Sequence, residues 1–356
     1  KTDNRPRGVA RARCEQALVA IAGAQLFAED GLNAAAEYVL AEIAQASDFA
    51  RGTLAGLNVR TLLSSGDLEA AMSAARAWDG PIAALDAHSR DASAALAARR
   101  LRCDRAEFLT GCGARLHAPC LFEAALADLG KAAHGLDPAY RPLSFARVQE
   151  LRGLALAGLG EAAGDATPLL EAAEILANAA DSIDPGHSPV DWARIQASLA
   201  QTLMALGEAG DCEAAFDKAI DGFARALSVL DGVPGLALRA GAAQSRATAL
   251  VRRAEVRGDV YALDEAEAVF RSELAALKPS LDPGAWAVVQ MNLARIYRAR
   301  AAICGGVREP LARAGEALAC ALDVFGEHGL RSLAAMADRE MELLRETVAR
   351  TAGSPS

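Results

Sequence analysis

Apolar residues recur at spacings of three and four through most of the chain, which is the period of an amphipathic α-helix. Residues 192–206 carry Trp192, Ile195 and Leu199 on one face, and residues 212–230 carry a second apolar stripe that includes Phe223. One helix pair cannot bury both stripes by itself, so each pair must stack on a neighbouring pair. We find no segment with the pattern of a strand and therefore expect an all-α protein.

The helical pattern repeats at a nearly constant interval. Four glutamines occupy one position of the repeat at intervals of 47, 48 and 46 residues: Gln149, Gln196, Gln244 and Gln290. Four glycines close the same segments at intervals of 46, 48 and 47 residues: Gly164, Gly210, Gly258 and Gly305. A turn precedes each copy, at Asp137-Pro138, Asp184-Pro185, Asp231-Gly232 and Asp282-Pro283. Three landmarks that keep one period indicate a tandem helical repeat.

The repeats predict three parts of the chain. Residues 1–136 are expected to hold degenerate repeats, in which 82–109 forms one long helix, Gly111-Cys112-Gly113 a turn and 119–133 the returning helix. Asp79-Gly80-Pro81 is expected to separate two helices, because Pro removes a donor and Gly permits a positive φ. Residues 137–329 are expected to hold regular repeats. Residues 330–356 are expected to form a capping helix and tail, since the open end of a solenoid must be soluble.

The residues Trp192, Ile195 and Leu199, followed by small residues in the second helix, resemble the tetratricopeptide repeat (TPR) family, and Trp286, Val289 and Leu293 match in the same way. The resemblance implies a right-handed α-solenoid of stacked antiparallel helix pairs with a C-terminal capping helix. The period of about 47 residues is longer than the family's standard unit of about 34. HEAT-type units of similar length are the alternative.

The resemblance also implies that the first helices line a concave groove that binds a peptide or protein. Carried over to this chain, the exposed groove positions are Glu150, Gly153, Leu154 and Ala157, then Ala197, Ala200, Gln201 and Met204, then Ser245, Thr248, Ala249 and Arg252, then Met291, Ala294, Arg295 and Arg298. An acidic segment would suit the end at Arg252, Arg295 and Arg298, because guanidinium groups hold carboxylates with paired hydrogen bonds. Solvated helix faces are the alternative interpretation of these arginines.

Composition narrows the classes of partner and compartment. The net charge of −9 argues against wholesale nucleic-acid binding, and the local run Arg99, Arg100, Arg102 and Arg105 is expected to be a solvated face. Seven cysteines are an odd number that does not look like a disulfide framework, which favours the cytoplasm. Arginines before the apolar run 17–28 superficially resemble a secretory signal, but we interpret this run as the first helix of the array. The periplasm is the alternative, if the start of the chain reflects removal of a signal. No apolar stretch reaches the length of a membrane span.

Candidate chemistry is sparse. The five histidines are scattered, and neither a metalloprotease spacing nor a phosphate-binding loop is present. Four potential soft-metal ligands lie within 18 residues: Cys103, Cys112, His117 and Cys120. They lack the paired CxxC spacing, so core packing is favoured over a zinc site or a redox pair. We expect no catalytic residue and no cofactor.

These observations predict a non-enzymatic scaffold or adaptor that binds a peptide or helical partner in its groove. A regulatory sensor whose solenoid groove takes a small molecule or signalling peptide is the alternative, and an enzyme with its site within 82–120 is the third. An adaptor requires an open groove, whereas a sensor requires an enclosed pocket of several hundred cubic ångströms, on the order of other ligand sites.

Overall fold

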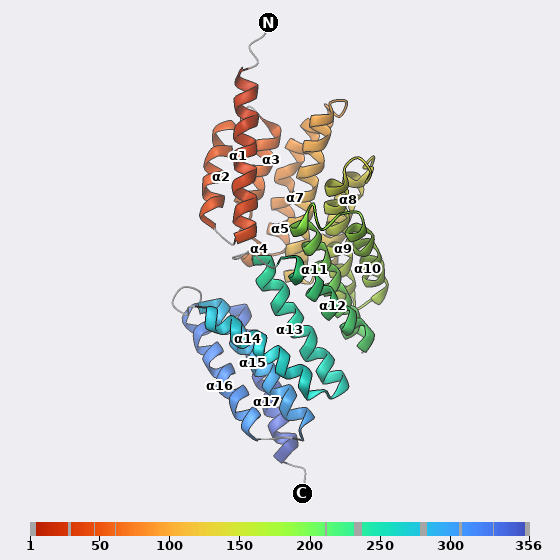
Figure 1. The fold of residues 1–356 in the computed structure, drawn as a ribbon. Helices are drawn as coiled ribbons and strands as arrows, with labels where there is room; N and C mark the ends of the chain where they lie inside the picture. The colour runs from red at the N-terminus through yellow and green to blue at the C-terminus, as the bar shows by residue number, and fades with distance from the viewer. Residues whose placement is uncertain are drawn as a thin grey trace. The chain divides into compact units, whose positions relative to one another are not determined.

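A computed structural model describes residues 5–27, 30–45, 47–60, 62–210, 212–230, 237–277, 283–305, 308–329 and 331–352. All regular secondary structure in these ranges is helical (Figure 1). The helices are α1 (Arg5–Phe27), α2 (Asp30–Ile43), α3 (Asp48–Asn58), α4 (Leu62–Ser65), α5 (Leu68–Ala75), the 3₁₀-helix η1 (Arg76–Trp78), α6 (Asp79–Asp86), α7 (Ala92–Leu116), α8 (Pro119–Ala133), α9 (Pro142–Ala163), α10 (Ala166–Asp181), α11 (Pro189–Gly210), α12 (Glu213–Val229), α13 (Ala237–Arg257), α14 (Val260–Ala276), α15 (Pro283–Ile303), α16 (Arg308–Glu327) and α17 (Arg331–Ala352). The chain is an all-α solenoid, as the sequence predicts.

The chain divides into two compact units. Residues 1–209 and 225–240 form the first unit, and residues 210–224 and 241–356 form the second, so that the division falls within α12. The boundaries expected near residues 136 and 329 remain a prediction. Among the described residues, no helix combines the length and the apolar character needed to cross a bilayer.

Local signals explain where the helices begin and end. Asp165 caps α10 by accepting a hydrogen bond from the backbone N–H of Thr167 (2.9 Å), and Asp259 caps α14 through Tyr261 in the same way (3.0 Å). Three of the four repeat glycines adopt the left-handed conformation at the end of a repeat's first helix: Gly164, Gly258 and Gly305, with φ of 65°, 69° and 76°. Gly210 is the last residue of α11. These turns therefore follow from residues visible in the sequence.

In the first unit, each helix pair buries small side chains against the next pair. α7 packs on α8 and α9, and α9 packs on α10. One cluster of buried residues joins α7, α8 and α9 through Leu101, Leu129 and Leu151, all 0–1% exposed. Phe122 and Trp78, each 1% exposed, are the largest side chains in this interior. The small residues Ala125 and Ala155 let the helices approach closely around them.

In the second unit, the repeat extends to individual ion pairs. Arg253 of α13 pairs with Asp217 of α12 (3.0 Å), and Arg300 of α15 pairs with Asp264 of α14 (2.8 Å). Each arginine lies 36 residues after its aspartate, and the two pairs are displaced by 47 residues. The period found in the sequence is therefore also the period of the contacts.

Several expected boundaries are wrong. Gly111-Cys112-Gly113 is not a turn, because α7 continues to Leu116 and ends at His117, whose φ is 50°. Gly113 instead makes room for the ring of Phe122, which would lie 3.1 Å from an added Cβ. The segment 82–109 is divided between α6 and α7. By contrast, the boundary expected at Asp79-Gly80-Pro81 is kept, because η1 ends at Trp78 and α6 begins at Asp79. These three residues form the first turn of α6, where the missing N–H of proline has no helical partner to lose.

The expected apolar side of the last helix is only partly buried. α17 packs against α15 and α16, with Ala337 and Leu344 buried, whereas Met336 and Val348 are 37% and 43% exposed. The turn at Asp231-Gly232, Asp282, the tail after Ala352 and the side chains of the first arginines lie outside the described residues.

Candidate interaction groove

A cavity of about 860 Å³ lies along α7, α9 and α11 in the first unit. Three repeat positions supply its wall, each contributing one residue from each of these helices: Thr110, Ala157 and Met204, then Gly111, Gly158 and Ala205, then Ala114, Glu161 and Glu208. Within each set, the residues are 47 positions apart. Phe122 of α8 and Leu169 of α10 also line the cavity, and both are buried. We name this cavity the α7–α9–α11 groove.

Glycines on α9 let α8 and α10 pack closely against this helix. A Cβ added at Gly158 would lie 2.3 Å from Phe122, and one at Gly153 would lie 2.5 Å from Leu176. Both distances are far below ordinary contact, so a side chain at either position requires its neighbour to move. Close packing therefore explains these glycines.

The groove is acidic. Its lining includes Glu161, Asp165 and Glu208 and no lysine or arginine. Desolvation by the groove walls raises the pKa of Glu161 above its ordinary value, and the charge of Glu208 raises it further, against a smaller opposing effect of His117. The pKa of Asp165 is lowered, because its carboxylate accepts the backbone and side-chain hydrogen bonds of Thr167. Two glutamates at equivalent repeat positions therefore lie close enough to repel each other.

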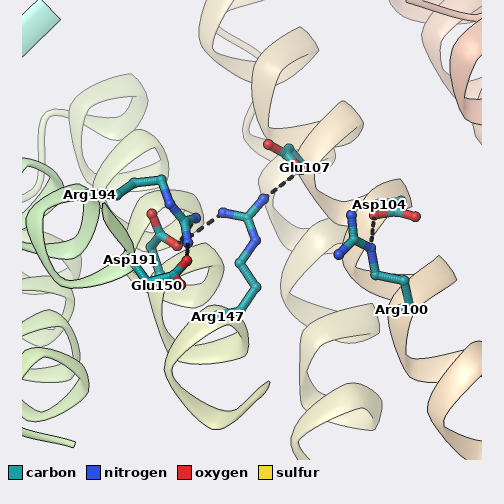
Figure 2. A network of polar contacts seen from close by, with 7 residues as sticks. All are labelled: Arg100, Asp104, Glu107, Arg147, Glu150, Asp191 and Arg194. Atoms are coloured by element: carbon teal, nitrogen blue, oxygen red, sulfur yellow. Dashed lines mark hydrogen bonds and ion pairs between the residues drawn. The ribbon is translucent and has the colours of Figure 1, made fainter. Parts of the chain in front are cut away.

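A second periodic feature, the arginine ladder, is formed by Arg100, Arg147 and Arg194, which are 47 residues apart on α7, α9 and α11 (Figure 2). Arg100 donates to Asp104 (2.8 Å). Arg147 donates to Glu107 (2.7 Å) and to Glu150 (3.0 Å), and Arg194 also donates to Glu150. The ladder thus joins α7 to α9 and α9 to α11.

Two groups of the ladder, Arg147 and Asp104, have shifted pKa values, and Glu150 is buried. Burial by itself would lower the pKa of Arg147, but the charges of Glu107 and Glu150 outweigh it and raise that pKa. Glu150 is 1% exposed and accepts from two arginines, which compensates for the loss of water around its charge. Burial raises the pKa of Asp104 despite the neighbouring Arg100.

The groove positions expected in the first unit are partly where the resemblance places them. Leu154, Ala157, Gln201 and Met204 all line the α7–α9–α11 groove. Glu150 does not, because it is buried within the arginine ladder, and Gly153 and Ala200 are also buried. These three positions were expected to be exposed, and that expectation is wrong.

In the second unit, the arginines expected to form the basic end of the groove are paired within the chain. Arg252 donates to Glu255 (3.0 Å), and Arg295 donates to Glu340 (2.7 Å). Arg298 lies 3.7 Å from Glu255 and 3.6 Å from Glu340. An acidic partner would therefore have to compete with two glutamates that these arginines already contact.

The remaining expected positions of the second unit differ in exposure. Thr248 is half-buried beside Arg252 and Arg298 at a cavity of about 10 Å³, which is too small for a peptide side chain. Met291, Ala249 and Ala294 are buried, contrary to the expected exposed stripe, because the adjacent helices cover this side of α13 and α15. Three of the eight expected positions of the second unit are thus buried, and the other five are partly exposed.

The alternative metal set is not assembled. Cys103 and Cys112 lie nine residues apart on one helix, a rise of about 13.5 Å, so one ion cannot bind both. Both are buried, and burial raises the pKa of Cys103 to about 12. His117 and Cys120 are exposed beyond the end of α7. In the described ranges, no three His, Cys, Asp or Glu side chains are grouped to hold a metal ion.

The arginine run on α7 is structural rather than simply solvated. Arg99 donates to the carbonyl oxygens of Ala132 (2.7 Å) and His134 (3.2 Å). Arg105 makes a bidentate pair with the buried carboxylate of Asp128, with both distances 2.6 Å. Arg102 pairs with Asp86. These arginines tie α7 to α8 and to α6.

Sequence reasoning missed the contribution of α7 to the groove. The aromatic anchor of the repeat is absent there, but the 47-residue register is kept, so that Thr110 corresponds to Ala157 and Ala114 to Glu161. Extending the register backwards by one period would have identified these residues. The same extension would also have related Arg100 to Arg147 and Arg194 in the arginine ladder.

Comparison with known proteins adds little. No protein-family model matches the chain, and no curated protein matches it. A solved structure described as "Circular tandem repeat protein with novel repeat topology and enhanced subunit contact surfaces" is 15% identical, with a TM-score of 0.31, over 97% of this chain and 96% of that chain. At so low a score, the fold assignment rests on the helices described above.

Proposed function

We propose that this chain is a non-enzymatic, TPR-like scaffold whose α7–α9–α11 groove binds a segment of a partner protein that is largely apolar and carries a basic side chain. The observation that carries this proposal is the composition of the groove. Three consecutive repeats present equivalent positions to one cavity, and its ionisable lining residues are all acidic.

The two glutamates of the groove favour a basic occupant. Desolvation and, to a smaller extent, the charge of Glu208 raise the pKa of Glu161, and a lysine or arginine placed near both glutamates would relieve their repulsion. An arginine would also form paired hydrogen bonds with a carboxylate. Charge complementarity therefore points to a basic partner rather than to the acidic one suggested by the arginines of the second unit.

The apolar part of the groove favours a segment of side chains rather than a single ion. Phe122, Leu154 and Met204 contribute apolar surface beside the glutamates. The volume of about 860 Å³ is in the range that takes several side chains or a small organic molecule. A preformed groove on packed helices loses little conformational freedom on binding, which favours affinity.

The test is selection from a random dodecapeptide library on the full chain, followed by fluorescence anisotropy with the enriched peptide. We expect peptides with Lys or Arg flanked by apolar residues. The Glu161→Gln, Glu208→Gln double variant should lose at least about tenfold in affinity, the equivalent of about 1.4 kcal/mol. Glu123→Gln, at an exposed position of α8 outside the groove lining, is the matched control and should bind as the parent does.

Two results would overturn the proposal. One is enrichment of acidic peptides whose binding is lost in Arg295→Gln, which would move the site to the second unit. The other is enrichment of peptides without basic residues, bound equally by the double variant and the parent.

A further inference from the structure

A separate pocket of about 150 Å³ lies in the first unit between α1, α3, η1 and α7. It shares no lining residue with the α7–α9–α11 groove. Trp78 and Phe108, 1% and 5% exposed, form its buried part, whereas Leu63, Arg100 and Glu107 are exposed at its edge. The pocket therefore combines an aromatic interior with a polar rim.

We propose that this pocket binds a small, uncharged, planar molecule, about the size of one aromatic ring, that carries a carbonyl or similar hydrogen-bond acceptor. This site goes beyond the peptide groove and is independent of it.

We infer that the ligand carries a hydrogen-bond acceptor from the environment of Trp78. Its indole Nε1 is buried, and among the residues that the structure describes it has no hydrogen-bond partner. Buried tryptophan N–H groups usually find an acceptor, because leaving one unpaired forfeits the hydrogen bond it made in water. The ligand would supply that acceptor.

Gly56 brings α3 close to the part of the Trp78 ring next to the unpaired N–H. This glycine lines the pocket, and a Cβ added to it would lie 3.1 Å from Cζ2 and 3.8 Å from Cε2 of Trp78. Both atoms belong to the benzo ring, and Cε2 is bonded to Nε1, so the glycine lies beside the part of the ring next to the unpaired N–H. A larger residue on α3 would cover this part of the ring.

We infer that the ligand is uncharged from the other polar groups that line the pocket. Two arginines and two acids line the pocket, which gives no net charge: Arg60, Arg100, Asp104 and Glu107. Asp104 is held by Arg100 (2.8 Å), and Glu107 is held by Arg147 (2.7 Å) in the arginine ladder of Figure 2. Thr53 donates its hydroxyl to the carbonyl oxygen of Phe49 (3.0 Å). Arg60 donates to the amide oxygen of Asn33 (3.4 Å), so each charged group of the pocket already has a partner. A charged ligand would have to displace one of these partners, whereas a neutral one would not.

The planar shape follows from the aromatic pair and the volume. The rings of Trp78 and Phe108 have centroids 5.7 Å apart and are inclined at 40°. A volume of about 150 Å³ is that of an engineered apolar cavity that binds benzene. Leu18, Ile21 and Leu57 complete the apolar lining.

The test uses the full chain and two probes of similar size. Benzamide carries a carbonyl acceptor and toluene does not. In ¹H–¹⁵N spectra, the indole resonance of Trp78 is assigned by its loss in Trp78→Phe, with Trp192→Phe as the matched control. We expect benzamide to shift this resonance and to bind about fivefold more tightly than toluene, the factor for one neutral hydrogen bond. In Trp78→Phe, this preference should disappear while toluene still binds.

Gly56→Ala provides a second variant if Trp78→Phe does not fold, because it places a methyl group over the same part of the indole. It should weaken benzamide binding with little change in the circular dichroism spectrum. The proposal is overturned if benzamide leaves the Trp78 resonance unmoved. It is also overturned if toluene binds the parent as tightly as benzamide, because the N–H is then not part of the site.

Discussion

Glu150 accepts a hydrogen bond from Arg194, which lies 44 residues later on the first helix of the next repeat. The carboxylate is 1% exposed and is shared with Arg147, so a charge on α9 connects two consecutive repeats. Because water has little access to this carboxylate, the contact between the two repeats depends on the charge of Glu150.

Replacing this acid should destabilise the protein. Glu150→Gln keeps the shape but leaves Arg147 with Glu107 and Arg194 with Asp191 as their only carboxylate partners, so we expect the free energy of unfolding to fall by about 2 kcal/mol. Urea denaturation followed by circular dichroism measures the change. Glu107→Gln removes a carboxylate of the same ladder that is 46% exposed, and it should cost less than about 1 kcal/mol. Equal losses in the two variants would contradict the role of burial.

Gly158 and Gly130 should respond to alanine in opposite ways. A Cβ at Gly158 would meet Phe122 at 2.3 Å, so Gly158→Ala should destabilise the protein by about 1–3 kcal/mol through overpacking. Gly130 lies in α8 with nothing within 4 Å of an added Cβ, so Gly130→Ala should stabilise it by about 0.5–1 kcal/mol through helix propensity. Urea midpoints test both, and stabilisation by Gly158→Ala would show that the helices separate at little cost.

Binding of a basic peptide to the α7–α9–α11 groove should depend on pH through Glu161. Its pKa is raised above the ordinary value of 4.5, so part of it stays protonated at pH values where a free glutamate is ionised. Affinity should therefore rise as the pH increases from 4.5 through the raised pKa, and Glu161→Gln should remove this part of the dependence. Anisotropy titrations between about pH 4.5 and 7 provide the measurement. An unchanged pH profile in the variant would exclude Glu161 as the contact.

The raised pKa of Glu161 has the opposite effect on the stability of the protein without a bound peptide. The folded protein binds the Glu161 proton more tightly than the unfolded chain does, so this group's contribution to stability decreases as the pH rises through that window. Glu161→Gln should flatten this decrease.

The cysteines should fall into two reactivity classes. Burial raises the pKa of the Cys103 thiol to about 12, so iodoacetamide at pH 8 should leave it unmodified in the folded protein. Four exposed cysteines should react: Cys120, Cys212, Cys304 and Cys320. Peptide mass spectrometry distinguishes them, and all seven should react in guanidinium chloride. Rapid labelling of Cys103 in the native state would contradict its burial.

Much of the fold could be predicted because its signals are local. The caps at Asp165 and Asp259 and the left-handed glycines Gly164 and Gly258 fix helix ends through neighbouring backbone atoms. Prediction failed at Gly111-Cys112-Gly113 because these glycines serve close packing within α7: an added Cβ would lie 2.9 Å from Leu63 at Gly111 and 3.1 Å from Phe122 at Gly113. Here Phe122, from the next helix, fills the space that Gly113 leaves.

The candidate groove could be predicted only in part for the same reason. The family resemblance placed Gln201 and Met204 among the groove positions, and both line the α7–α9–α11 groove, but it could not show that Glu150 turns inward to two arginines. Burial of a charge depends on partners 3 and 44 residues away, and only the second separation crosses between repeats.

The sequence by itself determined the helical class, the period of about 47 residues and the position of most turns, because these depend on residues within one or two helical turns of each other. Only the tertiary structure decided which face of each first helix is open. That choice depends on which side chains of neighbouring repeats meet, as Phe122 meets Gly158 and Arg194 meets Glu150. Packing and charge pairing between repeats are non-local, and a single helix does not contain them.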